Sequence, residues 1–231
     1  MKFSGRHYPK FIIVQAVRWY VSYGLSYRNI EEMMAERGFP MDHSTLNRWV
    51  LHYAPLLEEK ARKRKRPVEG SWRMDETYIK MKGKWVYLYR AVDKCGDTVD
   101  FMVSEKRDAV AAKTFFRKAF RHNRIPHRVN IDKSGANKAA LDALKASEAI
   151  NGREIDILQV KFLNNIVEQD HRYIKRITKP MGGFKSLDSA DKTIAGIELA
   201  HMIRKNQLSF PEYANQNLTP AQQFFLLASD A

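Results

Sequence analysis

The sequence predicts an α/β fold in which a mixed sheet flanked by helices follows a smaller all-helical module. A composition break at "EEKARKRKRPVEGSW" separates an N-terminal part with helical periodicity from a part rich in β-branched and aromatic residues. In that second part three strand-like segments come first, and helical and strand-like segments then alternate. We therefore expect three antiparallel strands followed by an alternating α/β arrangement.

Three helices are expected before the break. Phe11–Tyr20 forms the first, and Ser26 is a suitable N-cap for a second helix that Gly38 ends. A third helix begins at Asp42 or Ser44. Four of its residues recur at helical spacing and indicate a buried face: Leu46, Trp49, Val50 and Tyr53.

Small polar and basic side chains gather near the start of the third helix, on its other face. Two helices joined by a short turn, the second beginning in this way, are typical of a helix-turn-helix, in which such residues contact base edges in the major groove of DNA. The alternative is a small helical bundle with an ordinary polar surface. The candidate base-contacting residues are Thr45, Asn47 and Arg48.

Five consecutive basic residues follow the predicted helices. A run of like charges repels itself, and the Pro67 and Gly70 that come next interrupt regular structure, which predicts a basic linker over 61–70 after a DNA-binding module over 1–60. The run would contact DNA phosphates. Its members are Arg62, Lys63, Arg64, Lys65 and Arg66.

The charge of the whole chain also favours a polyanionic partner. The 231 residues carry a formal net charge of +14, which favours nucleic acid over the alternative of an anionic membrane surface. One cysteine and seven histidines without metal-site spacing argue against disulfides and zinc modules. No stretch is apolar enough to span a bilayer, so we expect a cytoplasmic bacterial protein that associates with the nucleoid when bound to DNA.

The second domain is expected to cover 71–205, with an apolar C-terminal tail over 206–231. Its first three strands, 72–80, 84–93 and 98–105, are separated by the short turns "MKGK" and "KCGD" and should form an antiparallel meander. The alternating elements then follow along the chain: a helix over 108–123, a strand over 127–132, a helix over 134–150, a strand over 154–160 and a helix from about Asn164 or Asn165.

Three acids occupy distinctive places in this arrangement. Asp75 lies within the first strand, Asp132 ends the fourth, and Glu168 lies near the start of the helix after the fifth. Each has an ordinary explanation alone, as an exposed strand residue, a turn or cap residue, or a solvated helix residue. Side chains from such positions converge at strand ends, where three carboxylates could hold two Mg²⁺ ions. Glu76 could replace Asp75, although strand alternation sends it to the opposite face.

Four long segments resemble one family of enzymes: "WRMDETYIKMKGKWVYLYRAVD", "NIDKSGANKAAL", "KFLNNIVEQDHRYIKR" and "GGFKSLDSADKTIAGIE". They are similar to DDE transposases of bacterial insertion-sequence family six, whose ribonuclease H-like catalytic core resembles that of retroviral integrases. Thirty-five residues separate Asp132 from Glu168, close to the spacing that such transposases use. The resemblance implies that Asp75, Asp132 and Glu168 are the catalytic carboxylates and metal ligands, and that Lys175 is the family's basic residue after the glutamate.

The resemblance also implies a reaction. The enzyme would bind double-stranded DNA at the ends of an insertion sequence, cut it, and join the 3′-hydroxyls to target DNA with two Mg²⁺ ions, for which Mn²⁺ can substitute. Joining two ends implies a homodimer or larger assembly at synapsis. Two rival functions remain: a nuclease of the same fold that cuts without joining, and a DNA-binding regulator with a non-catalytic second domain.

Helix geometry selects among the charged residues around Glu168. Arg172 and Lys175 follow it at i+4 and i+7, so both lie near its face and could contact a DNA phosphate. Asp170 points away around the helix and is left out of the site. Lys185, beside the glycine-rich "MGGFK", is a further candidate for DNA contact.

Overall fold

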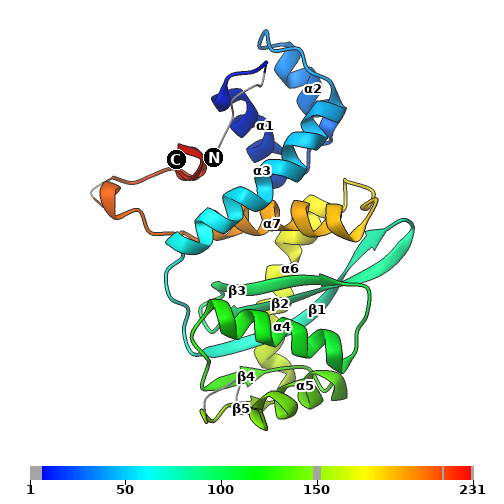
Figure 1. Cartoon of the computed structure of the whole chain (residues 1–231), viewed down its shortest axis with the longest axis vertical. Helices are drawn as coiled ribbons and strands as arrows, with labels where there is room; N and C mark the ends of the chain where they lie inside the picture. The colour runs from blue at the N-terminus through cyan, green and yellow to red at the C-terminus, as the bar shows by residue number, and fades with distance from the viewer. Residues whose placement is uncertain (1–6, 148–151, 215, 230–231) are drawn as a thin grey trace. The chain divides into compact units, whose positions relative to one another are not determined.

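The computed structural model describes residues 7–147, 152–214 and 216–229 (Figure 1). It divides into two compact units, Met1–Arg66 with Arg176–Ala231, and Pro67–Lys175. The end of the helix predicted over 134–150 lies outside the described residues from position 148 onward. Among the helices that are described, none is long and apolar enough to cross a membrane.

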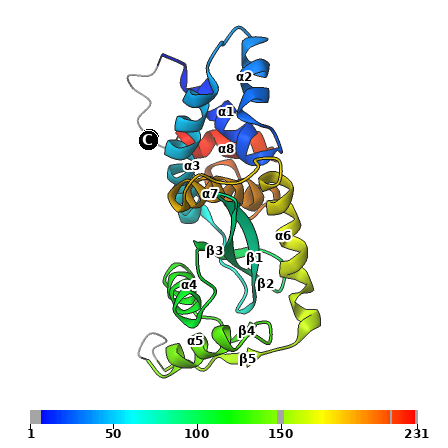
Figure 2. The ribbon, with the colours of Figure 1, turned by 90° about the vertical axis from the view of Figure 1, so that its right-hand side faces the viewer.

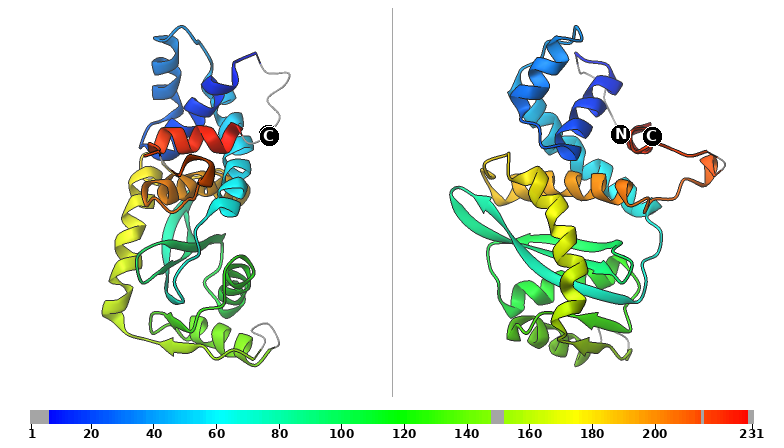
Figure 3. Two further views of the ribbon diagram at one scale, coloured as in Figure 1. Left: turned by 90° about the vertical axis from the view of Figure 1, so that its left-hand side faces the viewer. Right: turned by 180° about the vertical axis from the view of Figure 1, so that it is seen from behind.

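The first unit is helical. Its helices are α1 Lys10–Ser22, α2 Tyr27–Ala35, α3 His43–Arg64, α7 Leu187–Arg204 and α8 Pro220–Ser229, with a short 3₁₀ helix, η3, at Pro211–Tyr213. The apolar tail predicted over 206–231 contains α8, which packs against α1 and α7 and buries Phe224 and Leu227 (Figure 3).

The predicted helix starts at Ser26 and Asp42 are confirmed. The Ser26 hydroxyl accepts a hydrogen bond from the Asn29 N–H, and the Asn29 side chain accepts one from the Ser26 N–H, which completes a capping box. The Asp42 carboxylate accepts hydrogen bonds from the N–H groups of Ser44 and Thr45 at the start of α3. Both helices therefore begin where their sequences satisfy the free N–H groups.

α3 continues through the first residues of the predicted basic linker. Arg62 pairs with the buried Glu58 one turn earlier, and Nη2 of Arg64 lies 2.6 Å from Oε1 of Glu212. The helix dipole also favours cations at a C-terminus. Charge repulsion within the run is offset by these partners, so the chain remains helical as far as Arg64.

α7 belongs by its contacts to the helical unit, although the second domain was predicted to extend to residue 205. Its residues from Ala190 to Ile203 are almost all buried, and it packs against α1 and α3. A Cβ at Gly196 would lie only 2.7 Å from Val21 Cγ1 and 2.8 Å from the Cβ of Ala54. Because Gly196 has no side chain, α7 can approach α1 and α3 closely. This packing, which a prediction of the domain boundary from element order does not consider, joins α7 to the helical unit.

The second unit contains the predicted mixed sheet, which confirms the α/β fold class. Its strands are β1 Ser71–Met81, β2 Lys84–Asp93, β3 Thr98–Ser104, β4 Arg128–Asn130 and β5 Asp156–Leu158, in the order β3-β2-β1-β4-β5. The first three strands pair antiparallel, whereas β4 and β5 add in parallel. Its helices are α4 Ala109–His122 and α5 Gly135–Lys145, then η2 Lys161–Asn164 and the first part of α6 Asn165–Thr178.

The two faces of the sheet carry different helices. α4 and α5 cover one face over an apolar core, and α6 runs along the other face (Figure 2). The core includes Trp72, Met74 and Tyr89 of the sheet and Phe115 and Phe116 of α4. Strand alternation therefore turns Asp75 toward α6 and its neighbours in sequence toward α4 and α5.

Candidate active site

Parallel pairing brings the first two predicted acids together. β1 and β4 pair in register from Ser71 opposite Arg128 to Arg73 opposite Asn130. Continuing this register by two residues places Asp75 beside Asp132, just beyond the end of β4. One carboxylate oxygen from each of Asp75, Glu76 and Asp132 lies within 4.8 Å of the corresponding oxygens of the other two. We call these three residues the carboxylate group.

Glu76 lies close to Asp75 and Asp132, although strand alternation sends its side chain to the opposite face of β1, as expected. Because β4 ends at Asn130, β1 has no neighbouring strand on this side, and the two carboxylates meet around its free edge. The Glu76 side chain is 3% exposed, and its Oε1 is buried without a hydrogen-bond partner.

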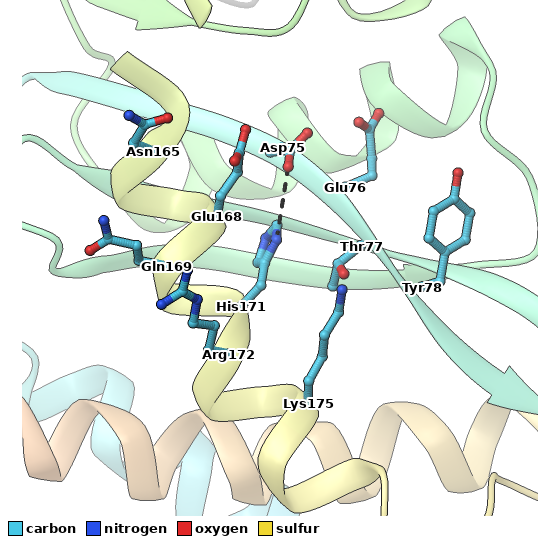
Figure 4. A pocket seen from close by; sticks show the side chains of 10 residues that line it. All are labelled: Asp75, Glu76, Thr77, Tyr78, Asn165, Glu168, Gln169, His171, Arg172 and Lys175. Carbon is cyan, nitrogen blue, oxygen red and sulfur yellow. Dashed lines mark ion pairs between the residues drawn. The ribbon is translucent and has the colours of Figure 1, made fainter. Parts of the chain in front are cut away.

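Glu168 lies beside the carboxylate group rather than within it. A pocket of about 580 Å³ is lined by residues of β1 and α6, including Asp75, Glu76 and Glu168 (Figure 4). Arg172 and Lys175 line the same pocket, one and two turns after Glu168. The structure thus brings both basic residues to the face on which the sequence placed them.

Two buried asparagines connect the strands to the start of α6. Asn130 Nδ2 donates to Oδ1 of Asn164 at 2.6 Å, and Nδ2 of Asn164 lies 3.4 Å from the carbonyl of Met74. Asn130 also holds the backbone of Val160 through its Oδ1 and Nδ2. Met74 immediately precedes Asp75, and Asn130 and Asn164 lie two and four residues before Asp132 and Glu168. One hydrogen-bonded network therefore holds the backbone near all three predicted acids.

Asp170 has a structural role that the sequence interpretation missed. Its Oδ2 lies 2.7 Å from Nη2 of Arg90 on β2, and the two side chains are 9% and 1% exposed. Asp170 does point away from Glu168, but it points into the sheet rather than into solvent. The ion pair fixes α6 against the strand that pairs with β1.

Arg107, in the loop between β3 and α4, places a positive charge against the carboxylate group. Its Nη2 lies 2.8 Å from Oδ2 of Asp132 and 3.3 Å from Oε2 of Glu76. Partial burial opposes its charge, but these two carboxylates outweigh that effect and raise the pKa of Arg107. The guanidinium therefore offsets the repulsion between the acids.

Burial and neighbouring negative charges disfavour ionisation of Asp75 and Glu76. Burial, and next the negative charge of Glu76, raise the pKa of Asp75 to about 7, with further contributions from Asp132 and Glu168. Burial also raises the pKa of Glu76, against the opposing charge of Arg107. Carboxylates brought this close, with one oxygen unsatisfied, form an arrangement that a divalent cation would stabilise.

His171 lies beneath Asp75 and is neutral at pH 7. Burial, and next the positive charge of Arg90, lower the pKa of His171 to about 3. Its Nδ1 is 3.8 Å from Oδ2 of Asp75 (dashed line in Figure 4), but a neutral ring forms no ion pair with the carboxylate.

The other predicted DNA contacts lie in the helical unit. Thr45 and Arg48 form a chain at the start of α3, in which Arg48 Nη2 donates to Thr45 Oγ1 at 2.8 Å and this hydroxyl donates to Asp42 at 2.7 Å. Lys185 is exposed just before α7. Neither these residues nor Asn47 and the run Arg62–Arg66 line the pocket beside Glu168.

Some of the missed residues had a signal in the sequence. Arg90 interrupts the apolar run "VYLYRAV", and a buried arginine requires an acidic partner, which Asp170 provides. Arg107 had no such signal, because a basic residue in a loop is ordinary. Its place beside Asp132 depends on contacts between distant segments.

Comparison with known proteins identifies the family. Residues 69–207 match a family model described as a DDE domain. The transposase for the insertion sequence-like element IS431mec of Staphylococcus aureus is 38% identical over 213 residues, which cover 91% of this chain and 92% of the relative. The transposase for insertion sequence element IS257 in transposon Tn4003, also from Staphylococcus aureus, has the same identity and coverage.

Solved structures show a more distant likeness. The catalytic core domain of BIV integrase has a TM-score of 0.43 and 17% identity, and the match covers 57% of this chain and 84% of that one. A chain in the simian T-cell lymphotropic virus intasome also has a TM-score of 0.43, with 16% identity, 73% of this chain and 57% of that chain covered.

The family model and the two relatives confirm the resemblance found in the sequence and the enzyme class that it implied, a metal-dependent transposase that cleaves and joins DNA. DNA is thus the partner and a divalent cation the cofactor, as the family implies. The chain belongs to the DDE-domain family of insertion-sequence transposases.

Proposed function

We propose that the enzyme binds the ends of its insertion sequence, cuts them to free 3′-hydroxyl groups, and joins these to target DNA at the site formed by Asp75, Asp132 and Glu168. Glu76 joins these acids as a fourth carboxylate. The observation that carries the proposal is the carboxylate group, with oxygens of three acids within 4.8 Å, beside a pocket that contains Glu168 and two basic residues.

The residues fit a divalent cation. Carboxylate oxygens are the ligands that Mg²⁺ prefers, and the buried, unpartnered Oε1 of Glu76 is an acceptor in need of a positive charge. We propose that Asp75, Glu76, Asp132 and Glu168 share two Mg²⁺ ions, with Mn²⁺ able to replace them. Bound cations supply positive charge that offsets the charge developing on the phosphoryl group.

The chain's own basic residues would orient the DNA. Arg172 and Lys175 rise from α6 beside Glu168 and would hold phosphates next to the scissile bond (Figure 4). The buried Asn130–Asn164 network and the Arg90–Asp170 pair would hold α6 at a constant distance from β1. Little movement is then needed to assemble the acids when DNA binds.

Recognition of the ends is assigned to the helical unit. Asp42 orders Thr45 and Arg48 at the start of α3, and with Asn47 these residues would contact base edges. Basic residues of this unit would contact phosphates, and the candidates are Arg62, Lys63, Arg64, Lys65, Arg66 and Lys185. Lys63, Arg66 and Lys185 are the exposed members of this set. Two ends joined in one event require at least two copies of the enzyme, so we propose a homodimer or larger assembly, bound to DNA in the nucleoid.

The deciding experiment supplies purified protein, Mg²⁺, labelled duplexes carrying the terminal sequences that border the gene, and a supercoiled plasmid. Labelled ends joined to plasmid are the expected product. Cut ends without joined product would instead indicate a nuclease, and a mobility shift without chemistry would indicate a regulator. Omitting Mg²⁺ should leave the mobility shift and remove the joined product.

Lys175→Ala should weaken binding of the DNA end and make it less sensitive to salt. Each lost phosphate contact lowers the slope of log affinity against log salt concentration by about 0.9. Fluorescence anisotropy from about 50 to 200 mM salt measures this slope. Lys145→Ala, which removes an exposed lysine of α5, serves as the control. An unchanged slope for Lys175→Ala would contradict a phosphate contact.

Arg107→Gln should tighten metal binding, because a cation no longer has to replace the guanidinium beside Asp132 and Glu76. We expect about tenfold tighter Mn²⁺ binding, the equivalent of one hydrogen bond between charged groups. Electron paramagnetic resonance of free Mn²⁺ measures it without DNA. Arg117→Gln, which removes an exposed arginine of α4, is the control. Weaker or equal binding by Arg107→Gln would show that Arg107 does not compete with the metal.

A further inference from the structure

The β1–β2 hairpin extends beyond the strands beside it. β4 pairs with β1 only as far as Arg73, and β3 pairs with β2 only from Tyr87 onward. The outer part of the hairpin, up to the turn at Lys82 and Gly83, is therefore a two-stranded ribbon (Figures 1 and 3). A two-stranded ribbon of this kind has little stability of its own, and its edges are open to pairing. It therefore adds little to the stability of the fold, and a role in binding would explain its presence.

Aromatic rings line one face of this ribbon. Tyr78 pairs with Tyr87, and Lys80 pairs with Trp85, so these four side chains share a face. Tyr78 is 48% exposed and Trp85 is 64% exposed. The Tyr78 ring lies 5.3 Å from the Tyr87 ring and 6.5 Å from the Trp85 ring. We call Tyr78, Trp85 and Tyr87 the aromatic face.

The surroundings of the aromatic face are positively charged. Lys80, Lys82 and Lys84 are exposed at the end of the ribbon, and the chain has no acidic residue between Glu76 and Asp93. Rings combined with lysines suit a nucleic acid strand, because bases stack on the rings while the lysines contact phosphates. Inside a duplex the neighbouring pairs cover both faces of a base, whereas an unpaired base can turn its face to a flat side chain.

The aromatic face also begins next to the carboxylate group. Glu76 and Tyr78 lie two residues apart on the same face of β1, which corresponds to about 7 Å along the strand. Both also line the pocket that contains Glu168 (Figure 4). A nucleotide adjacent to a phosphate at the carboxylate group would therefore lie within reach of Tyr78.

We propose that the aromatic face binds an unpaired nucleotide of the DNA end, next to the phosphate that is cut, by stacking its base on Trp85, with Tyr78, whose ring lies at 74° to that of Trp85, against the edge of the base. This inference rests on the proposed function, because it places the cut phosphate at the carboxylate group. A second copy of the chain is a poorer occupant, since the three lysines would face another strongly basic surface with a net charge of +14.

The test compares two duplexes carrying the terminal sequence of the element, one fully paired and one with two unpaired nucleotides at its tip. Each contains 2-aminopurine at the tip, whose fluorescence falls when it stacks on an aromatic ring. The wild-type enzyme should quench the unpaired probe. Trp85→Ala should weaken its binding by about 5- to 100-fold and restore the fluorescence, whereas Trp85→Phe should retain both properties.

One control variant and three possible outcomes complete the test. Phe162→Ala removes an exposed aromatic residue outside the aromatic face and should leave quenching unchanged. Equal affinity and quenching for Trp85→Ala and wild type would overturn the proposal. So would a Trp85→Ala change confined to self-association in sedimentation without DNA. Failure of wild type to join ends to plasmid, with quenching intact, would reject the proposed function but not the stacking.

Discussion

Asp75→Asn is expected to reduce strand transfer by more than about a hundredfold, because metal ligands and the charge they hold contribute several kcal/mol to stabilising the transition state. The substitution should not unfold the enzyme. Burial and neighbouring acids already raise the pKa of Asp75 to about 7, so a neutral side chain relieves repulsion there. Joined product in the plasmid assay measures the loss, and thermal unfolding checks the fold.

The same assay separates the roles of the two glutamates. Glu168→Gln should lose strand transfer as fully as Asp75→Asn. Glu76→Gln should lose it as well if its oxygen holds a metal ion, and should also weaken Mn²⁺ binding in the absence of DNA. Asp142→Asn, which alters an exposed acid of α5, is the matched control. Binding of DNA ends should persist in all of them, because end recognition is proposed for α3.

Strong residual joining by Glu168→Gln would remove Glu168 from the proposed site. If Glu76→Gln joins DNA ends to the plasmid at the wild-type level, Glu76 has only a structural role, as the ion-pair partner of Arg107. The pattern across the variants therefore assigns each carboxylate separately.

Asp170→Ala is expected to lower the free energy of unfolding by about 3–5 kcal/mol, because it leaves the buried Arg90 without its acidic partner. Strand transfer should fall as well, since α6 carries Glu168. Urea unfolding followed by circular dichroism measures the stability. Gln169→Ala, at an exposed neighbouring position on α6, should change stability by less than about 0.5 kcal/mol.

Removing both partners gives the sharper comparison. In the double variant Arg90→Met with Asp170→Leu, neither charge of this pair is left, and most of the lost stability should return. If the double variant is as unstable as Asp170→Ala, burial of the Arg90 charge in the absence of Asp170 is not the cause. Recovery of strand transfer along with stability would show that the pair acts by fixing the position of α6.

Local signals in the sequence were sufficient for most elements. Hydroxyl and carboxylate caps marked the starts of α2 and α3, and short turns separated the three antiparallel strands, because these features depend on neighbours in the chain. The places of Asp75 and Asp132 could also be predicted, since acids at adjacent positions of parallel strands converge. The same local reasoning could not foresee that a basic run would remain helical by pairing with Glu58 and Glu212.

What the sequence did not reveal depends on distant contacts. Glu76 lies near Asp75 and Asp132 because β4 ends before β1 does. The point at which β4 ends relative to β1 could not be predicted from the residues of either strand alone. Arg107 reaches Asp132 from a loop 25 residues earlier. Asp170 was set aside because helix geometry shows only where a side chain points, not what lies there. By contrast, Arg90 within an apolar strand did indicate a buried acidic partner, which is Asp170.

The paired asparagines at the start of α6 constrain how this enzyme can change over time. Asn130 and Asn164 each present a donor or an acceptor that the other satisfies, inside the protein and away from water. Replacing either one alone strands a buried polar group beside the acids, at a cost of about 1–3 kcal/mol. A change at both positions must therefore pass through a less stable single variant. We expect related sequences either to keep both asparagines or to replace both.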